Sequence, residues 1–144
     1  MSRSARLLAV ATLVGASTLT ACSADPSPTV TAPAAPTLAP SYSYTLASSC
    51  GERAMYGTFS LTVDEGAVAA VEGLDTVGIR EAAGLPLETF PTIETLTARA
   101  ASDDPAEASY DPDTGMLTKV VFDPVPQGVD DEECYVISDY TPAP

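Results

Sequence analysis

The first forty residues set the strongest limit on what this chain of 144 residues can fold into. A short basic segment ends at Arg6, and an uncharged, mostly apolar run of 13 residues follows from Leu7 to Leu19. A helix that spans a membrane needs about 20 apolar residues, so this run is too short. A basic head followed by a run of this length is typical of an export signal that is later removed. We therefore expect residues 1–21 to be a signal peptide that takes no part in the fold.

The residues that end this segment predict a lipid anchor. Leu19-Thr20-Ala21-Cys22 places an apolar residue and two small residues before a cysteine, which resembles the lipobox of bacterial lipoproteins. The resemblance implies cleavage between Ala21 and Cys22 and a diacylglycerol on the Cys22 thiol. Two acyl chains hold a protein at a bilayer more firmly than one. We expect the chain to be lipid-anchored at the extracytoplasmic face of the cell membrane. The alternatives are an ordinary secretory signal and a buried helix of a cytoplasmic protein.

Residues 22–40 are expected to be a linker between this anchor and a single domain at residues 41–141. The segment is rich in proline, alanine and threonine and shows no apolar periodicity. Proline fixes φ and removes hydrogen-bond donors, so such a segment is extended and semi-rigid. At about 3.1 Å per residue in polyproline II, it would hold the domain up to about 55 Å from the membrane.

The charge of the chain excludes several classes of partner. The formal net charge is −14, with 20 acidic residues, six basic residues and no histidine. Such a chain repels nucleic acid, because proteins gain affinity there by neutralising phosphates with lysine and arginine. The lack of histidine removes the commonest general base and the commonest transition-metal ligand. We expect an acidic, soluble domain with no nucleic-acid partner.

Alternating apolar and polar residues predict a sheet. Phe59, Leu61 and Val63 recur with a period of two, so we expect them on the buried face. Residues 64–66 (Asp-Glu-Gly) and residues 111–115 (Asp-Pro-Asp-Thr-Gly) have the composition of tight turns, so each should close a hairpin. The expected strands are Tyr42–Leu46, Thr58–Val63, Val68–Leu74, Glu107–Tyr110, Met116–Phe122 and Cys134–Tyr140.

One helix is expected between the two halves of the sheet. Ile93, Leu96 and Ala100 form an apolar stripe with helical spacing. Pro91 is expected in the first helical turn, where its missing N–H has no cost, and residues 103–105 (Asp-Asp-Pro) should end the helix.

Together these elements predict an α+β fold. The sheet should be small and antiparallel, with five to six strands, two hairpins and one helix packed on it. Glu94 and Arg99 lie near the ends of that helix whose partial charges they complement. Residues 76–88 show no clear period and are expected to be a loop or a short helical turn.

After acylation of Cys22, only Cys50 and Cys134 remain to form a disulfide. An exported protein reaches an oxidising compartment, and small domains are often stabilised by such bonds. In the chain-entropy model, closing a loop of this length contributes about 4–5 kcal/mol. The competing interpretations are a redox pair, which is usually Cys-x-x-Cys, and metal thiolates, which need further ligands nearby. We expect the structural disulfide Cys50–Cys134.

Two acidic segments raise the question of calcium. In an EF-hand loop that began at Asp111, the twelfth residue would be a bidentate glutamate, but it is Phe122. The hairpin turn explains the same residues. The acidic run 130–133 offers hard oxygen ligands, yet such runs are usually solvated loops. We therefore assign no metal ligand.

No motif in the sequence points to catalysis. The chain lacks Gly-x-Ser-x-Gly and Ser-x-x-Lys, and Lys119 is its only lysine. Some carboxylate pair will lie close together on so acidic a domain, so a glycoside hydrolase has little specific support. We expect no catalytic residue and no cofactor.

Several segments resemble a family of uncharacterised lipoproteins, a domain of unknown function, from high-GC Gram-positive bacteria. They are Tyr42-Ser-Tyr44-Thr-Leu46 with Cys50, Val63-Asp-Glu-Gly-Ala-Val68, Tyr110-Asp-Pro-Asp-Thr-Gly115 with Lys119-Val-Val-Phe-Asp123, and Asp130-Asp-Glu132. The likeness covers most of residues 41–141. Where that family often has two closely spaced cysteines after the first strand, this chain has only Cys50. The resemblance implies a lipoprotein with a compact α+β domain and no known activity.

We therefore expect a monomeric, non-enzymatic domain of the cell envelope that is tethered to the membrane through Cys22. Its partner would be an envelope protein or a component of the cell wall. The alternatives are a Ca²⁺-dependent structural module and a carboxylate-dependent hydrolase of cell-wall glycans.

Overall fold

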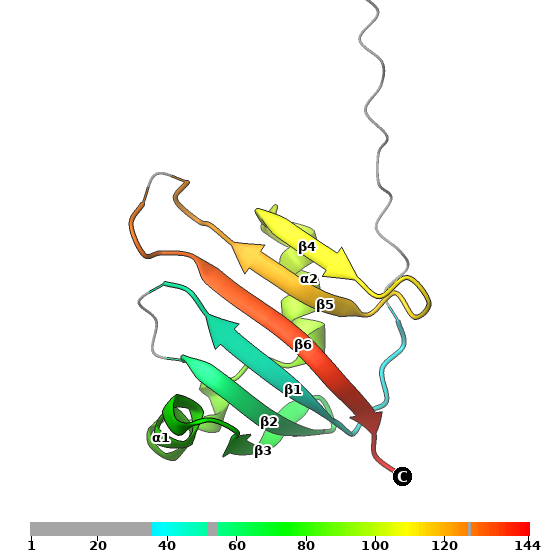
Figure 1. Cartoon of the computed structure of the whole chain (residues 1–144). Coiled ribbons are helices and arrows are strands. Elements are labelled where there is room, and N and C mark those ends of the chain that lie inside the picture. The colour runs from blue at the N-terminus through cyan, green and yellow to red at the C-terminus, as the bar shows by residue number, and fades with distance from the viewer. Residues whose placement is uncertain (1–35, 52–54, 127) are drawn as a thin grey trace, which may run out of the picture. The chain divides into compact units, whose positions relative to one another are not determined.

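The computed structural model describes residues 36–51, 55–126 and 128–144, which form an antiparallel sheet with helices on one face (Figure 1). This is the α+β fold that the sequence predicts. The predicted signal peptide, with the predicted cleavage and lipidation residues Ala21 and Cys22, and most of the predicted linker lie outside the described residues. The elements are β1 (Tyr42–Ser49), β2 (Gly57–Asp64), β3 (Ala67–Gly73), α1 (Thr76–Gly84), the 3₁₀ turn η1 (Leu87–Thr89), α2 (Ile93–Ser102), β4 (Glu107–Tyr110), β5 (Leu117–Phe122) and β6 (Glu133–Pro142).

The sheet has the order β3-β2-β1-β6-β5-β4, so the first and last strands of the chain lie side by side at its centre. At one end of this central pair, Tyr42 lies opposite Pro142, and at the other end Ser49 lies opposite Cys134. We call these the terminal end and the loop end. Tyr42 and Ser49 are the first and last of the eight residues of β1, so the two ends are about 23 Å apart at about 3.3 Å per residue.

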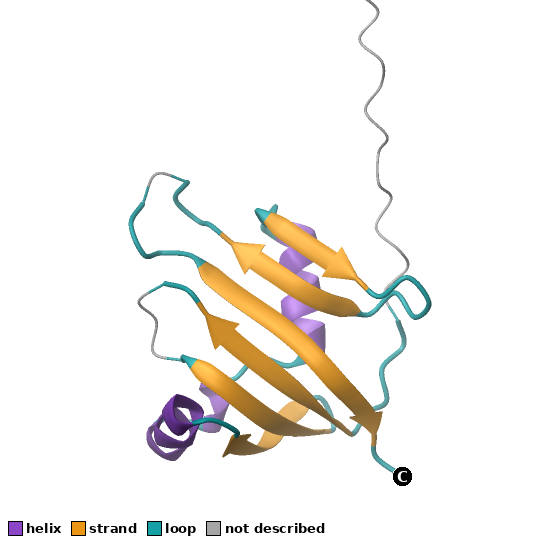
Figure 2. Ribbon diagram, in the orientation of Figure 1, coloured by secondary structure: helices purple, strands orange, loops and turns teal. Residues whose placement is uncertain are grey.

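One face of the sheet carries the core, because every second residue of β1 and β2 points toward the helices. Tyr42, Tyr44 and Leu46 are buried on β1, as Phe59 and Leu61 are on β2. The opposite face of β1 and β2 carries mainly serine, threonine and alanine, and Figure 2 shows no helix across it among the described residues. The inward pattern predicted for β2 is confirmed.

Two tyrosines of β1 position the start of α2. The Tyr44 hydroxyl donates to the carbonyl of Pro91, and the Tyr42 hydroxyl accepts from the Ile93 amide at 3.2 Å. Helix α2 begins at Ile93 with Thr92 as its N-cap. The prediction that Pro91 lies in the first helical turn is therefore wrong by two residues, because the Thr92 hydroxyl accepts from the Thr95 amide and so sets the boundary.

Residues 76–88, expected to be a loop or a short helical turn, form the nine-residue helix α1 and then the turn η1, so the helix is longer than expected. Asp75 caps this helix by accepting from the Gly78 amide at 2.6 Å, and it also accepts from the Thr58 amide at 2.8 Å. A Cβ on Gly78 would lie only 2.4 Å from the Thr58 carbonyl oxygen. Glycine has a low helix propensity, but a glycine is required at position 78 because α1 approaches β2 so closely.

Residues just before the first strand also contact the domain. Leu38 packs against the core, and the Ala39 amide donates to the Tyr140 hydroxyl at 3.0 Å. The Pro40 carbonyl accepts from the Gly66 amide. The chain therefore enters the sheet at the terminal end through a short segment that is already packed. In the part of the chain that the structure describes, no helix has both the length and the apolarity needed to cross a bilayer.

Candidate functional site

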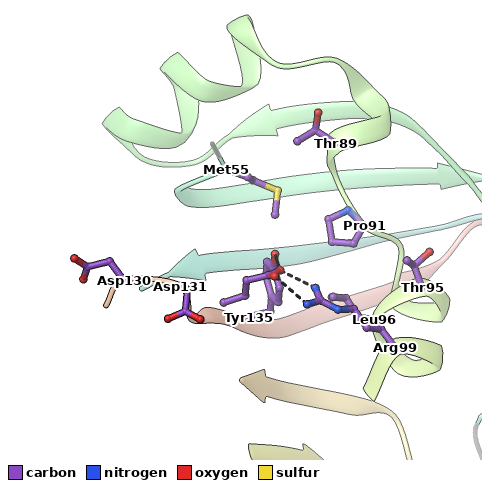
Figure 3. A pocket seen from close by; sticks show the side chains of 10 residues that line it. Met55, Thr89, Pro91, Thr95, Leu96, Arg99, Asp130, Asp131 and Tyr135 are labelled. Carbon is purple, nitrogen blue, oxygen red and sulfur yellow. Dashed lines mark hydrogen bonds and ion pairs between the residues drawn. The ribbon is translucent and has the colours of Figure 1, made fainter. Parts of the chain in front are cut away.

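A cavity of about 640 Å³ lies at the loop end, between the start of α2 and the loops that follow β1 and β5 (Figure 3). This volume falls in the range of small-molecule and side-chain binding pockets. Its walls are partly apolar, and its polar groups come from α2, from the loop before β6 and from β6 itself. The described lining residues are Met55, Thr89, Pro91, Thr95, Leu96, Arg99, Asp130, Asp131, Glu133 and Tyr135.

An ion pair forms the polar wall of this cavity. The Arg99 guanidinium donates to both carboxylate oxygens of Glu133, at 2.7 and 2.9 Å, and Tyr135 donates to the same carboxylate at 2.8 Å. The Glu133 side chain is 6% exposed and the Arg99 side chain is 33% exposed. Bidentate pairs of this kind fix both side chains in one geometry. The hydrogen bonds from Arg99 to Glu133, with a further one to Asp103, raise the pKa of the guanidinium, which therefore stays charged.

Arg99 also connects three elements of the fold. It projects from α2, its partner Glu133 begins β6, and its guanidinium carbon lies 3.8 Å from the centre of the Phe122 ring on β5. Stacking on an aromatic face adds a cation–π attraction to the ion pair. The position of the cavity wall is therefore fixed by packing as well as by charge.

The acidic loop before β6 lines the other side of the cavity. Both carboxylate oxygens of Asp131 have less than 1 Å² of accessible surface and no hydrogen-bond partner among the described residues. This carboxylate lies against Gly128 of the same loop, where an added Cβ would be 2.1 Å from Asp131 Oδ1. Asp130 is exposed and also lines the cavity. A buried carboxylate without a donor is costly, and because the two Asp131 oxygens are covered, Asp130 is the acid of this loop that a ligand in the cavity can reach directly.

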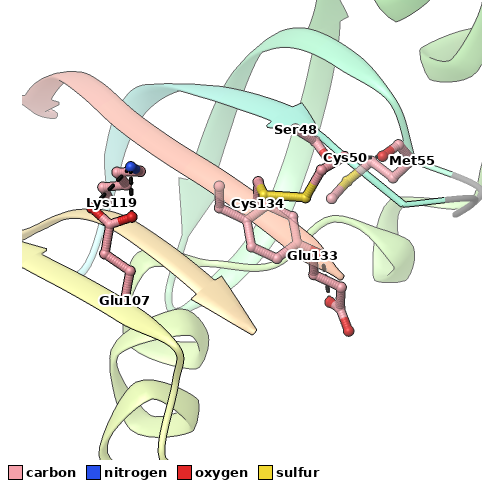
Figure 4. Close-up of a disulfide and its surroundings, with 8 residues drawn as sticks. Ser48, Cys50, Met55, Glu107, Lys119, Glu133 and Cys134 are labelled. Atoms are coloured by element: carbon pink, nitrogen blue, oxygen red, sulfur yellow. Dashed lines mark hydrogen bonds and ion pairs between the residues drawn. A yellow bond between two sulfur atoms is a disulfide. The ribbon is translucent and has the colours of Figure 1, made fainter. Parts of the chain in front are cut away.

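Cys50 and Cys134, the predicted disulfide residues, are joined in the structure, with Cα atoms 5.6 Å apart (Figure 4). The bond lies at the loop end, where Cys50 follows β1 and Cys134 lies in β6. Beside it, a Cβ on Gly51 would lie 2.1 Å from the Glu132 carbonyl oxygen. The disulfide therefore holds together the two loops that border the cavity.

The predicted turn at residues 111–115 behaves as a turn. Asp111 Oδ1 accepts from the amides of Asp113 and Thr114 and from the Thr114 hydroxyl, and Gly115 has a φ of 74°. These hydrogen bonds, first those from Thr114, lower the pKa of Asp111. Over the described ranges, no group of three histidine, cysteine, aspartate or glutamate side chains is arranged to hold a metal ion.

The cavity was not predicted from the sequence, and Arg99 was expected only to complement the partial charge at the carboxyl end of its helix. A signal was present, because Arg99 follows Leu96 by three residues and therefore shares the face of α2 that turns toward the sheet. Glu133 was treated as the end of a solvated acidic run. The strand alternation that leads from Glu133 through Tyr135 to Ile137 places all three on the inner face, where they are buried.

The chain was compared with known proteins at three levels. A search of curated proteins found no match. A search of solved structures found none either. Residues 37–142 match a family of unknown function, DUF6174, across strands β1 to β6 and both helices. Because this match covers most of the chain, the protein belongs to the DUF6174 family.

Proposed function

We propose that this protein is a membrane-anchored lipoprotein whose domain binds a ligand of the cell envelope in the cavity at the loop end, without turning it over. The observation that carries the proposal is the position of that cavity. The chain enters the sheet at the terminal end, and the cavity lies at the opposite end of strands β1 and β6. If the chain is tethered through Cys22, the cavity would lie at the end of β1 and β6 away from the point where the chain enters the sheet.

The character of the cavity supports binding rather than catalysis. Glu133 accepts hydrogen bonds from Arg99 and Tyr135, so its carboxylate is oriented by protein groups. Packing holds both donors in place, because Arg99 stacks on the Phe122 ring and Tyr135 is buried in the core. A site of this kind recognises the shape and charge of a ligand, because its polar groups are fixed before the ligand arrives.

The anchor is tested separately from the cavity. Cells that express the full chain are grown with a clickable palmitate analogue, and the mature protein is analysed by mass spectrometry. We expect label on wild type in the membrane fraction and none on Cys22→Ala, which should lose its membrane association. An unmodified amino terminus on wild-type protein recovered from the cytosol would refute the anchor.

Binding is tested by filling the cavity. Thr89 and Thr95 line it and are exposed, so Thr89→Trp should block the cavity with little effect on the core. Thr62→Trp, on the uncovered face of β2, is the matched control. Envelope extract is passed over the immobilised mature chain, and captured material is compared by mass spectrometry. We expect one component that wild type and Thr62→Trp retain and Thr89→Trp loses by at least about ten-fold. Equal capture by all three would show that the cavity is not the site.

A second candidate function is a carboxylate-dependent hydrolase of cell-wall glycans, because Asp130, Asp131 and Glu133 line one cavity. It predicts release of soluble sugar fragments when purified protein is incubated with cell-wall glycan. Asp130→Asn and Asp131→Asn would be compared, and at least one would abolish the release. Intact glycan after prolonged incubation with wild type would rule this candidate out.

A further inference from the structure

We infer that the ligand of the loop-end cavity is a basic segment of a partner protein that inserts one apolar side chain. This inference rests on the proposed function and specifies its ligand. It follows from the exposed apolar residues at the loop end, from the charge around them and from the cavity itself.

Large apolar side chains are exposed at the loop end. Tyr56 (44% exposed) precedes β2, and Leu74 (51%) follows β3. In the loop between β5 and β6, Val125 is 55% exposed and Val129 is 86% exposed. Exposed apolar side chains near a pocket can extend an interaction site beyond it. None of these four side chains lines the cavity, so an occupant that contacts any of them as well as the cavity is larger than a small molecule.

The negative charge at the loop end favours a basic partner. Asp130 and Glu132 flank the cavity-lining Asp131, and the whole chain carries a formal net charge of −14. Each lysine or arginine in the described part of the chain is already paired with a carboxylate: Arg80 with Glu81, Arg99 with Glu133 and Asp103, and Lys119 with Glu107. Among the described residues no lysine or arginine is paired with Asp130 or Glu132, so a basic segment would find acids there to pair with, and complementary charge accelerates encounter and fixes register.

The cavity supplies the anchoring point. Met55, Pro91 and Leu96 give it apolar walls, and about 640 Å³ accommodates one large side chain with its neighbours. Interfaces gain most of their affinity from a few side chains buried in such pockets, with polar contacts around them.

The test uses a short fluorescein-labelled peptide in which lysines flank one phenylalanine. Its binding to the full mature chain is followed by fluorescence anisotropy. We expect saturable binding that weakens as salt is raised, because exposed charge pairs are screened. Replacing the phenylalanine by alanine should weaken binding by about ten-fold. Replacing every lysine by glutamate should abolish it.

Protein variants locate the contact. Asp130→Asn/Glu132→Gln should weaken peptide binding by about five-fold, in the range of two exposed charge pairs. Glu65→Gln/Asp113→Asn removes the same charge from turns at the terminal end and should bind like wild type. Equal loss in both double variants would show a general charge effect and overturn the inference. Binding of the glutamate peptide, or no binding of the lysine peptide, would overturn it as well.

These outcomes separate the inference from the proposed function. If the lysine peptide fails while Thr89→Trp still loses an envelope component, the basic class is wrong and the cavity remains the binding site. If Thr89→Trp captures everything that wild type captures, the proposed function fails together with the inference.

Discussion

Arg99 is the residue on which the loop end depends most. It binds Glu133 through two hydrogen bonds, stacks on Phe122 and reaches Asp103 one turn further along α2. Removing one partner of a buried pair is costly, because the remaining charge stays desolvated. Since Arg99 is one-third exposed, water can compensate part of that cost.

We predict that Glu133→Ala lowers the free energy of unfolding by about 2 kcal/mol, and that Glu133→Gln lowers it less because the amide still accepts a hydrogen bond. Urea denaturation measures both. Glu107→Ala is the matched control, since its ion pair with Lys119 is exposed on both sides. It should change stability by about 0.5 kcal/mol or less. A Glu133→Ala variant as stable as the control would show that the pair adds nothing.

Asp75 gives a prediction about pH. The Gly78 amide, and then Thr58, lower its pKa below the ordinary value of 3.8 in the folded state. A carboxylate with a depressed folded pKa stabilises the fold above its unfolded pKa, and that contribution is lost as pH falls through the folded value. Thermal melts should therefore show Asp75→Asn less stable than wild type at neutral pH, with the difference shrinking below pH 3.8. A difference that stays constant with pH would contradict this assignment.

At the scale of elements, α1 is held to the sheet by contacts between backbones. A Cβ on Gly73 would lie 2.1 Å from the Ile79 amide nitrogen, and one on Gly57 would lie 2.6 Å from the Gly78 nitrogen. Ile79 itself is 60% exposed, and the apolar contacts of this segment with the core come from Ala82 and Leu85, which are only partly buried. The helix is placed by its Asp75 cap and by the absence of side chains where it crosses the strands.

Two glycines of α1 therefore differ in their tolerance of alanine. Gly78→Ala should lower the free energy of unfolding by about 2 kcal/mol, because its Cβ would overlap the Thr58 carbonyl. Gly84→Ala meets nothing within 4 Å and should be neutral or stabilising by about 0.5 kcal/mol. Chemical denaturation of the two variants gives the comparison. Equal effects would mean that helix propensity, and not the close approach, sets the cost.

At the scale of the whole molecule, the chain is closed on itself at the centre of the sheet. Strands β1 and β6 pair from Tyr42 with Pro142 to Ser49 with Cys134, and the disulfide continues this link at the loop end. The sequence separation of the two cysteines is 84 residues. The loop that the disulfide closes contains β2 to β5 and both α-helices, while β1 and most of β6 lie outside it.

We predict that Cys50→Ser/Cys134→Ser lowers the free energy of unfolding by about 4 kcal/mol, the chain-entropy value for a loop of this size. Urea denaturation of wild type with and without reductant, and of the double variant, measures it. Reduced wild type should behave like the variant, and reductant should leave the variant unchanged. Oxidised wild type no more stable than the variant would show that the bond is not formed or does not stabilise the domain.

The local parts of the fold could be predicted because their causes are local. The alternation in β2, the turn at Asp111 and the stripe from Ile93 to Ala100 each follow from side chains a few residues apart. Helix α1 could not be predicted this way. Gly78 lowers helix propensity, and the contact with β2 that requires it joins segments about twenty residues apart.

The sequence by itself determined the strands, the main helix and the acidic charge and, with Cys22 assigned to the predicted lipid anchor, the one remaining cysteine pair, because periodicity, composition and cysteine count need no partner in space. Tertiary structure alone decided the order of the strands, which brings β6 between β1 and β5. That order sets Glu133 beside Arg99, 34 residues apart in the chain, and opens a cavity next to them. The physical reason is that the burial of one sheet face under α2 selects this pairing, and no short segment contains that information.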